Sequence, residues 1–190
     1  MDRSGAVCQV RSKIVNSVWR GQCGQCLVNM EKFDCSRVVG VASMRLQRKQ
    51  PQQLIIKFVD GSTMLLFKTG KFRIMGGKID EVSAHCNVLS VTTYLHPTNM
   101  PEIALQTMTM VYTYPYSINI AKLSTLIKCH YNTECFPAVQ ITKYKPIHVN
   151  VFASGKVIMC GIKNIEDAKN IETELDNLIA CSFLYYKEEN

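Results

Sequence analysis

Two short blocks with the same order of residue types could carry chemistry in this chain: Phe67-Lys-Thr-Gly-Lys71 and Phe152-Ala-Ser-Gly-Lys156. Both contain a Gly-Lys pair, but neither has the glycine spacing of a Walker phosphate loop. The chain has no Gly-x-Gly-x-x-Gly, Ser-His-Asp or His-Glu-x-x-His pattern and no evident catalytic acid pair. Its histidines, at positions 85, 96, 130 and 148, do not cluster in sequence. We therefore expect a binding protein and not an enzyme.

Cysteine spacing gives one weak metal or redox motif. Cys23-x-x-Cys26 has the spacing of half a zinc site or of a redox pair, and no second such pair follows. Cys8 and Cys35 could complete a tetrad, but the repeat described below puts Cys23 and Cys26 on a strand, so we expect no metal and no cofactor. Nine cysteines without an apolar leader predict reduced thiols.

Composition and charge narrow the class of partner. The chain has 190 residues, 47% hydrophobic and 19% charged, which predicts a globular core. No apolar run approaches the roughly 18–20 residues of a membrane span, so we expect no membrane partner. Residues 1–95 carry 14 Lys/Arg against 6 Asp/Glu, and residues 96–190 carry 8 against 9. A basic half favours a polyanion such as nucleic acid, and the alternative is a solvated basic surface.

The chain repeats itself at an offset of 85 residues. Between Phe67 and Glu81, six of fifteen positions are identical to their counterparts 85 residues later. About one identity is expected by chance at this length. The same offset aligns 33–46 with 118–131 and 54–58 with 139–143. We therefore expect an arm or extra strand over 1–19, one repeat over 20–100 and a second over 101–190.

Each repeat has the local pattern β-α-β-β-β-α. We expect opening strands over 21–30 and 105–114, then a short amphipathic helix. Three strands follow, over 53–59, 63–69 and 71–77 in the first repeat and over 137–144, 148–154 and 156–162 in the second. Helices over 79–95 and 165–183 close the repeats. Trp19 is expected to fill the core. Antiparallel strands with helices on one face predict an α+β fold.

The second repeat resembles the core domain of the TATA-box-binding protein family. The residues that carry the resemblance are Glu134-Cys-Phe-Pro137 and Phe152-Ala-Ser-Gly-Lys156, and the first repeat matches mainly at Phe67-Lys-Thr-Gly-Lys71. The resemblance implies one curved, saddle-shaped antiparallel sheet of ten strands with helices on the convex face. It also implies a transcription initiation factor that binds AT-rich promoter DNA in the minor groove, with phenylalanines wedged between base steps that bend the DNA.

The resemblance assigns roles to individual residues. It implies wedges at Phe67, Phe136 and Phe152, with Pro51 at the fourth wedge position, and phosphate contacts at Lys57, Lys71 and Lys156. The other positions would form the floor that faces the groove, where this chain departs most from the family's valine, asparagine and threonine. They are Gln22, Gly24, Leu65, Arg73, Met75, Thr107, Thr109, Asn150, Ile158 and Cys160.

Partners follow from the same resemblance. Glu134 matches the glutamate on which a B-type initiation factor docks, and RNA polymerase machinery would follow. Two repeats in one chain already provide a pseudo-twofold axis, so we expect the protein to bind DNA as a monomer. Divergence of the first repeat suggests that the protein comes from a virus or a fast-evolving lineage. We therefore expect it in the nucleus or at a viral replication site in the host cell. The alternative function is a fold relative without DNA binding that serves as a protein-interaction scaffold, which Pro51, Arg73 and Asn150 favour.

Overall fold

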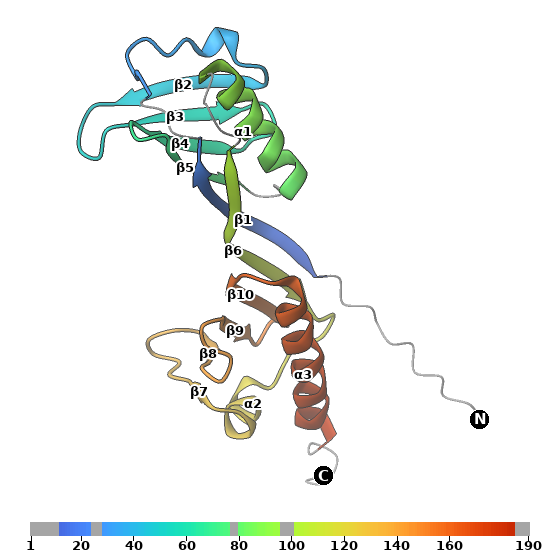
Figure 1. The fold of residues 1–190 in the computed structure, drawn as a ribbon. Helices are drawn as coiled ribbons and strands as arrows, with labels where there is room; N and C mark the ends of the chain where they lie inside the picture. Colours follow the sequence, from blue (N-terminus) through green and yellow to red (C-terminus); the bar gives the residue numbers. More distant parts are fainter. Residues whose placement is uncertain (1–11, 24–27, 77–79, 96–100, 185–190) are drawn as a thin grey trace. The chain divides into compact units, whose positions relative to one another are not determined.

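A computed structural model describes residues 12–23, 28–76, 80–95 and 101–184. The chain divides into two compact units, which we call the first unit (Val15–Met108) and the second unit (Thr109–Asn190 together with Met1–Ile14). Within the described ranges, no helix is long and apolar enough to cross a membrane. Each unit is a layer of antiparallel strands with a helix packed along it (Figure 1).

The strands hydrogen-bond in the order β2-β3-β4-β5-β1-β6-β10-β9-β8-β7, which makes one ten-stranded antiparallel sheet. The first unit contributes β1 (Lys13–Gln22), β2 (Val41–Gln47), β3 (Gln53–Phe58), β4 (Thr63–Phe67) and β5 (Lys71–Gly76). The strand β6 (Glu102–Thr113) runs from the first unit into the second, which adds β7 (Cys129–His130), β8 (Ala138–Ile141), β9 (His148–Phe152) and β10 (Lys156–Ile162).

In the first unit, a two-residue alternation separates a core face from an exposed face of the sheet. Leu54, Ile56 and Phe58 of β3 are buried, whereas Lys57 is exposed. The helix α1 (Glu81–Leu95) covers the core face with Ala84, Val88 and Val91, which recur at helical spacing. Asp80 caps α1 by accepting a hydrogen bond from Ser83 N at 2.7 Å. A single 3₁₀ turn, η1 (Cys35–Arg37), precedes β2.

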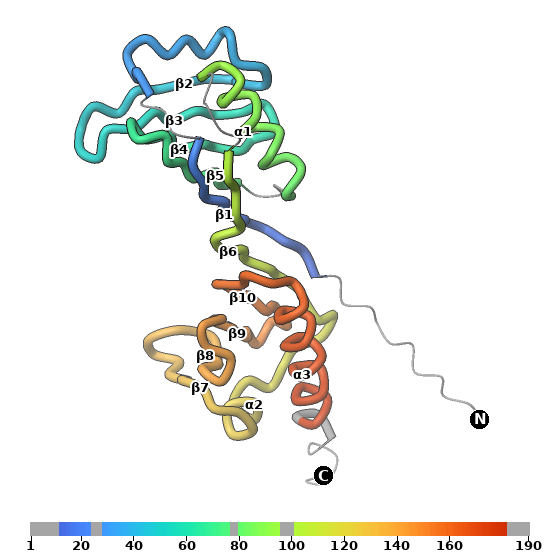
Figure 2. Tube along the Cα trace, viewed as in Figure 1, coloured from blue at the N-terminus to red at the C-terminus, as the bar shows by residue number. Residues whose placement is uncertain are grey.

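The second unit has the same plan with longer helices. The short helix α2 (Ile120–Leu126) takes the place of η1, and Asn119 caps it through Lys122 N at 3.0 Å. The helix α3 (Ile165–Leu184) packs on β10. Its buried residues recur at helical spacing: Ala168, Ile171, Leu175 and Ile179. Figure 2 shows the chain running back and forth through β8, β9 and β10 before it enters α3.

The fold class predicted from the sequence, α+β with two tandem repeats in one antiparallel sheet, is confirmed. The closing helices and the three strands before each of them lie where they were expected, within about three residues at either end. Trp19 is buried, as predicted, with 8% of its surface exposed. Each repeat contains one strand more than its local pattern predicts, namely β2 and β7, and these bring the total to the ten that the family resemblance implies.

The opening strand predicted over residues 21–30 is wrong, because β1 ends at Gln22. Equivalent backbone hydrogen bonds give the reason. Cys23 N donates to Gly70 O at 2.8 Å, and Tyr114 N donates to Gly155 O at 2.9 Å. Cys23 is therefore the counterpart of Tyr114, an offset of 91 residues and not 85. The first unit contains six more residues between its opening strand and the Thr-Gly-Lys turn, which an ungapped alignment cannot accommodate. Residues 13–19 thus belong to that opening strand.

Candidate nucleic-acid interface

The exposed sheet face of the first unit contains a hollow of about 1180 Å³. Its lining comes from the loop around Pro51, the end of β4 with Phe67, the strands β1 and β5, and the start of β6. It brings together five residues that the sequence assigned to the candidate site: Gln22, Pro51, Phe67, Lys71 and Arg73. Sheet register accounts for the arrangement, since Phe67 lies opposite Gln53 and Lys71 lies opposite Gln22.

Three further predicted residues of the first unit lie on the same face. Leu65 of β4 stands opposite Arg73 of β5, and Thr63 of β4 stands opposite both Lys57 of β3 and Met75 of β5. Lys57 and Arg73 are exposed, while Leu65 and Met75 are half-buried. The Gln22 amide is engaged locally, because its Nε2 donates to Thr69 O at 2.7 Å. Gly24 lies outside the described residues.

Two residues of this face were missed by the sequence alignment. With the offset of 91 residues, Thr107 and Thr109 correspond to Asn16 and Val18, and not to Gln22 and Gly24. Asn16 is exposed and Val18 is half-buried, whereas their neighbours Ser17 and Trp19 are buried. The β-branched and aromatic residues of Lys-Ile-Val-Asn-Ser-Val-Trp were the signal that could have identified β1.

In the second unit, the two predicted wedge rings lie side by side. Their ring centroids are 5.9 Å apart and their planes meet at 64°, an edge-to-face pair of Phe136 and Phe152. Phe136 is 36% exposed, although a phenylalanine of a strand or loop is usually buried. Phe152 ends β9 opposite Ala138 of β8, and Phe136 N donates to Asn132 O at 3.0 Å. The loop before β8 therefore holds one ring against the other.

The remaining predicted residues of the second unit line its outward-facing strand positions. Ile158 pairs with Asn150, and Cys160 pairs with His148, across β10 and β9. Thr109 lies between the buried Met108 and Met110 of β6, so it faces away from the core. Thr107, which belongs to the first unit, precedes Met108 in the same alternation. Lys156 is exposed at the start of β10. This face is uncharged apart from Lys156 and the histidines of its strands.

Glu134 lies in the loop between β7 and β8, two residues before Phe136. It is exposed, and its backbone N–H donates to Asn132 Oδ1 at 3.0 Å, which fixes a tight turn. The predicted partner-docking side chain is therefore presented to solvent next to a predicted wedge ring.

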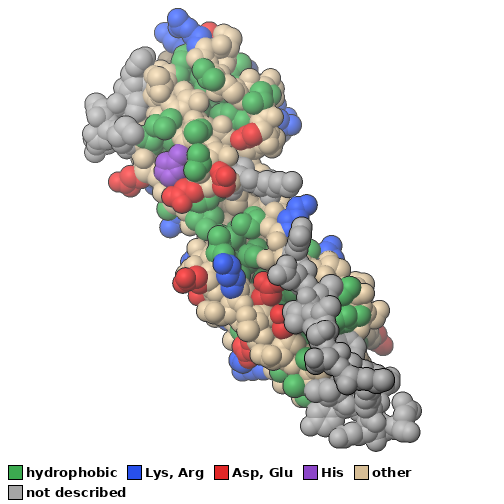
Figure 3. Space-filling view, turned by 90° about the vertical axis from the view of Figure 1, so that its right-hand side faces the viewer, with side chains coloured by type: hydrophobic (Ala, Val, Ile, Leu, Met, Phe, Trp, Pro, Cys, Tyr) green, Lys and Arg blue, Asp and Glu red, His purple; other side chains and the backbone are tan. Residues whose placement is uncertain are grey.

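Negative charge in the second unit gathers on α3, on the opposite side of the strands from these residues. Burial, followed by the neighbouring carboxylate of Asp176, raises the pKa of Glu172. Burial also raises the pKa of Tyr114, whose hydroxyl donates a hydrogen bond to Asp176. Acidic, basic and hydrophobic side chains are interspersed on the face drawn in the space-filling view of Figure 3. Carboxylates of α3 are thus kept away from the outward face of the strands.

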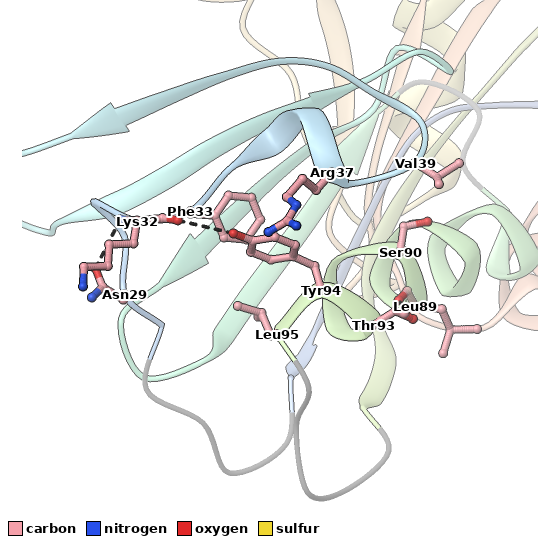
Figure 4. A pocket seen from close by; sticks show the side chains of 10 residues that line it. All are labelled: Asn29, Lys32, Phe33, Arg37, Val39, Leu89, Ser90, Thr93, Tyr94 and Leu95. Carbon is pink, nitrogen blue, oxygen red and sulfur yellow. Dashed lines mark hydrogen bonds between the residues drawn. The ribbon is translucent and has the colours of Figure 1, made fainter.

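A second hollow of the first unit, of about 870 Å³, lies on the helix side of its sheet (Figure 4). Phe33 and Tyr94 form an edge-to-face pair there with centroids 4.8 Å apart. The Tyr94 hydroxyl donates to Lys32 O and accepts from Asp34 N. This hollow contains no residue assigned to the candidate site. The described residues include no cluster of His, Cys, Asp or Glu that could hold a metal, and Cys8 and Cys26 of the possible tetrad lie outside them.

Comparison with known proteins agrees with this geometry. Residues 102–180 match the family described as transcription factor TFIID (or TATA-binding protein, TBP). A TATA-box-binding protein of Methanococcus aeolicus is 33% identical over 111 residues, which are 55% of this chain and 61% of that protein. The corresponding protein of Methanothermococcus thermolithotrophicus is 30% identical over the same length. This chain is similar in sequence to TATA-box-binding proteins. The resemblance predicted from the Phe-x-Ser-Gly-Lys block is thereby confirmed.

The solved structure of Methanococcus jannaschii TBP shows the same fold. It superposes with a TM-score of 0.69 over 90% of this chain and 99% of that one, at 22% sequence identity. The chain spans about 61% of the length of the curated TATA-box-binding proteins it matches. Those proteins are named for binding DNA and not for a reaction, in agreement with the expectation of a binding protein. The roles of the individual site residues remain predictions.

Proposed function

We propose that this chain is a TATA-binding-protein-like transcription initiation factor that binds AT-rich promoter DNA through the minor groove and bends it. The observation that carries this proposal is the contact of the exposed Phe136 ring with the half-buried Phe152 ring, beside an almost uncharged strand face. Similarity to proteins named TATA-box-binding protein supports it.

The chemistry of the second-unit face suits a minor groove. AT base pairs present only acceptors there, the adenine N3 and thymine O2 atoms, which the hydroxyl of Thr109 and the amide of Asn150 can satisfy. Ile158 adds apolar contact. Because the face is almost uncharged, the edges of the bases can lie against it without burying an unpaired charged side chain. Two rings inserted into one base step would unstack it at a cost of a few kcal/mol, roughly, which the additional protein–DNA contact offsets. Steps such as TA deform most easily, which gives a preference for AT-rich sites.

Glu134 supplies the proposed protein contact. Its carboxylate is exposed in the loop next to Phe136, so a partner docked there would be positioned close to the bent DNA. We assign this site to a basic surface of a B-type initiation factor, through which polymerase machinery would be recruited.

A DNA titration tests the proposal. Fluorescence anisotropy at two salt concentrations would compare an AT-rich duplex containing TA steps with a GC-rich duplex, and energy transfer between the duplex ends would report bending. The wild type should prefer the AT-rich duplex and bend it. The Phe136→Ala/Phe152→Ala variant should lose at least ~10-fold in affinity and lose the bend.

Tyr116→Ala is the matched control, because it removes another exposed aromatic ring of the second unit, 44% exposed, from a position outside the predicted wedges. It should bind like the wild type. Weak wild-type binding that is indifferent to both sequence and the phenylalanine substitutions would refute the proposal. That result would favour the protein-interaction scaffold, with Glu134 and the acidic helix α3 as the surfaces to probe.

A further inference from the structure

The first unit has an open trough at the place where the second unit packs a short helix. Asp34 caps η1 with its side chain, and Asn119, 85 residues later, caps α2 in the same way, so η1 and α2 are counterparts. The helix α2 has seven residues and packs against α3. The turn η1 has only three residues, and Val38 after it is already extended. The hollow of about 870 Å³ between α1 and residues 29–39 therefore corresponds to space that a helix occupies in the second unit. We call this hollow the helix-side trough.

The helix-side trough has two walls and a fixed floor. Figure 4 shows the residues from Leu89 to Leu95 of α1 on one side and the segment 29–39 on the other. The edge-to-face pair of Phe33 and Tyr94 lies between them, and the Phe33 ring is buried. The Tyr94 hydroxyl forms hydrogen bonds with two backbone groups of the segment 29–39, which join the walls. The trough is thus formed before any partner arrives.

Two aliphatic side chains of the trough are exposed to solvent in the free protein. Val39 is 81% exposed and Leu89 is 40% exposed, although valine and leucine are among the residues most often buried. Neither contributes to the core of the unit, which α1 covers with its other face. An apolar contact with a partner would remove both side chains from water.

The charge of the trough is positive. Lys32 and Arg37 line it and are exposed, and none of the described residues that line it is acidic. The nearby carboxylate of Asp34 is engaged within its own turn, because its Oδ1 accepts hydrogen bonds from Ser36 N at 3.1 Å and Ser36 Oγ at 2.7 Å. In the part of the chain that the structure describes, the ion pair is that of Lys143 with Glu174, so neither cation of the trough is paired there.

The size of the trough suits a helix. A helix with its side chains is about 10–12 Å across and rises about 5.4 Å per turn, so 870 Å³ corresponds to roughly one and a half to two turns. This is close to the length of the seven-residue α2. An amphipathic helix laid in a groove presents apolar anchors at i, i+3 or i+4, and i+7, and its flanking positions lie over the rims of the groove.

We infer that the helix-side trough is a docking site for an amphipathic helix of a partner protein, with acidic residues flanking its apolar ridge. The ridge packs on Val39, Leu89 and the aromatic floor, and the carboxylates pair with Lys32 and Arg37. This inference goes beyond the proposed function and does not depend on it, because the trough lies on the helix side of the first unit and leaves its exposed sheet face free.

Peptide binding to the full chain tests the inference. The probes are three labelled, alanine-rich peptides of about 15 residues, a length at which such sequences form helix. The acidic probe has leucines along one face and glutamates beside them, the basic probe has lysines in place of the glutamates, and the permuted probe has the acidic composition without an apolar face. At low salt, fluorescence anisotropy should show the acidic probe binding at least ~10-fold more tightly than either of the others. Its advantage over the basic probe should shrink at high salt.

Substitutions locate the site. Lys32→Gln/Arg37→Gln should weaken binding of the acidic probe about 5–10-fold at low salt. Val39→Ser/Leu89→Ser should weaken it by a similar factor at any salt concentration. The matched control is Arg45→Gln/Lys57→Gln, which removes two exposed cations from the sheet face of the same unit and should bind the probe like the wild type. Urea denaturation followed by Trp19 fluorescence checks that each variant remains folded.

Several results would overturn the inference. They are failure of the acidic probe to bind at about 1 mM, equal binding of the acidic and basic probes, or wild-type affinity in both trough variants. Sedimentation velocity tests a second copy as the occupant: dimerisation that Val39→Ser/Leu89→Ser abolishes would show that the trough binds another copy of this chain and not an acidic partner.

A DNA titration separates this inference from the proposed function. Lys32→Gln/Arg37→Gln should bind the AT-rich duplex like the wild type, and a loss of DNA affinity would place these cations on the DNA and contradict the assignment. Failure of the wild type to bind any duplex would remove the proposed function, while binding of the acidic probe would still support the docking site.

Discussion

Replacing Gly155 with alanine should destabilise the second unit more than the same substitution at Gly61 destabilises the first unit. Gly155 has φ +86°, and a Cβ atom there would lie 2.5 Å from Tyr116 O and 2.7 Å from Tyr114 O. The left-handed backbone costs an alanine about 1–2 kcal/mol. Both contacting atoms belong to the backbone, so overpacking adds about 1–3 kcal/mol. The free energy of unfolding should therefore fall by about 2–5 kcal/mol.

Two other glycines calibrate this magnitude. Gly61 has φ +84° but no atom within 4 Å of its virtual Cβ, so Gly61→Ala should cost only the backbone term of about 1–2 kcal/mol. Gly161, in the same unit as Gly155, has φ +86° and a nearest atom at 3.1 Å, Pro146 O, so Gly161→Ala should fall between the two. The three variants share one backbone conformation and differ in steric space.

Urea denaturation followed by two signals measures the effect. Far-UV circular dichroism reports both units, while the fluorescence of Trp19, the single tryptophan of the chain, reports the first unit. Gly155→Ala should shift the dichroism transition, and Gly61→Ala should shift the fluorescence transition by a smaller amount. Equal destabilisation by Gly155→Ala and Gly61→Ala would refute the steric argument, because space around the Cβ is what distinguishes these sites.

Three smaller predictions concern polar contacts. Tyr94→Phe removes the bonds to Lys32 O and Asp34 N, so it should lower stability by about 1 kcal/mol in the Trp19 signal, and no change would mean that water replaces them. Burial raises the pKa of Asp60, but hydrogen bonds from Ser62 and Asn87 outweigh it and lower the pKa below its usual 3.8. The stabilisation that the ionised Asp60 carboxylate gives to the folded state is therefore present above pH 3.8 and lost as the pH falls below that value. Wild type and Asp60→Asn should differ in melting temperature at pH 7 and converge near pH 2, and a constant difference would contradict this. Lys143→Ala should cost under ~1 kcal/mol, because its pair with Glu174 is 49% and 40% exposed, and a larger loss in urea denaturation would contradict this.

The strands next to the closing helices could be predicted because their alternation and turns are local. Leu54, Ile56 and Phe58 recur at every second position, and Gly61 and Gly70 mark the turns that follow. The strand β2 escaped prediction because its outward positions include Arg45 and Ser43 and because it lies at an edge of the sheet. The two-residue strand β7 is too short to show any period.

The candidate site was predictable in the second unit and less so in the first. Phe152 belongs to a block that recurs at Phe67, whereas Phe136 was assigned to the site through the family resemblance, because Pro51 stands at its counterpart in the first repeat. Arg20 meets Arg73 only through the register of β1 on β5, and sequence separation hides that contact. The six-residue difference between the units displaced Thr107 and Thr109 from Asn16 and Val18, since a gapless repeat cannot detect it.

The paired backbone hydrogen bonds at Gly70 and Gly155 have a consequence for how such a molecule can change. Each bond joins one main-chain N–H to one main-chain carbonyl. It therefore does not depend on the identity of the surrounding side chains, except that a glycine must adopt positive φ. Substitutions on the outward face of the strands then leave these two hydrogen bonds intact. A duplicated architecture can therefore acquire two different recognition chemistries, one for each copy, without either copy having to refold.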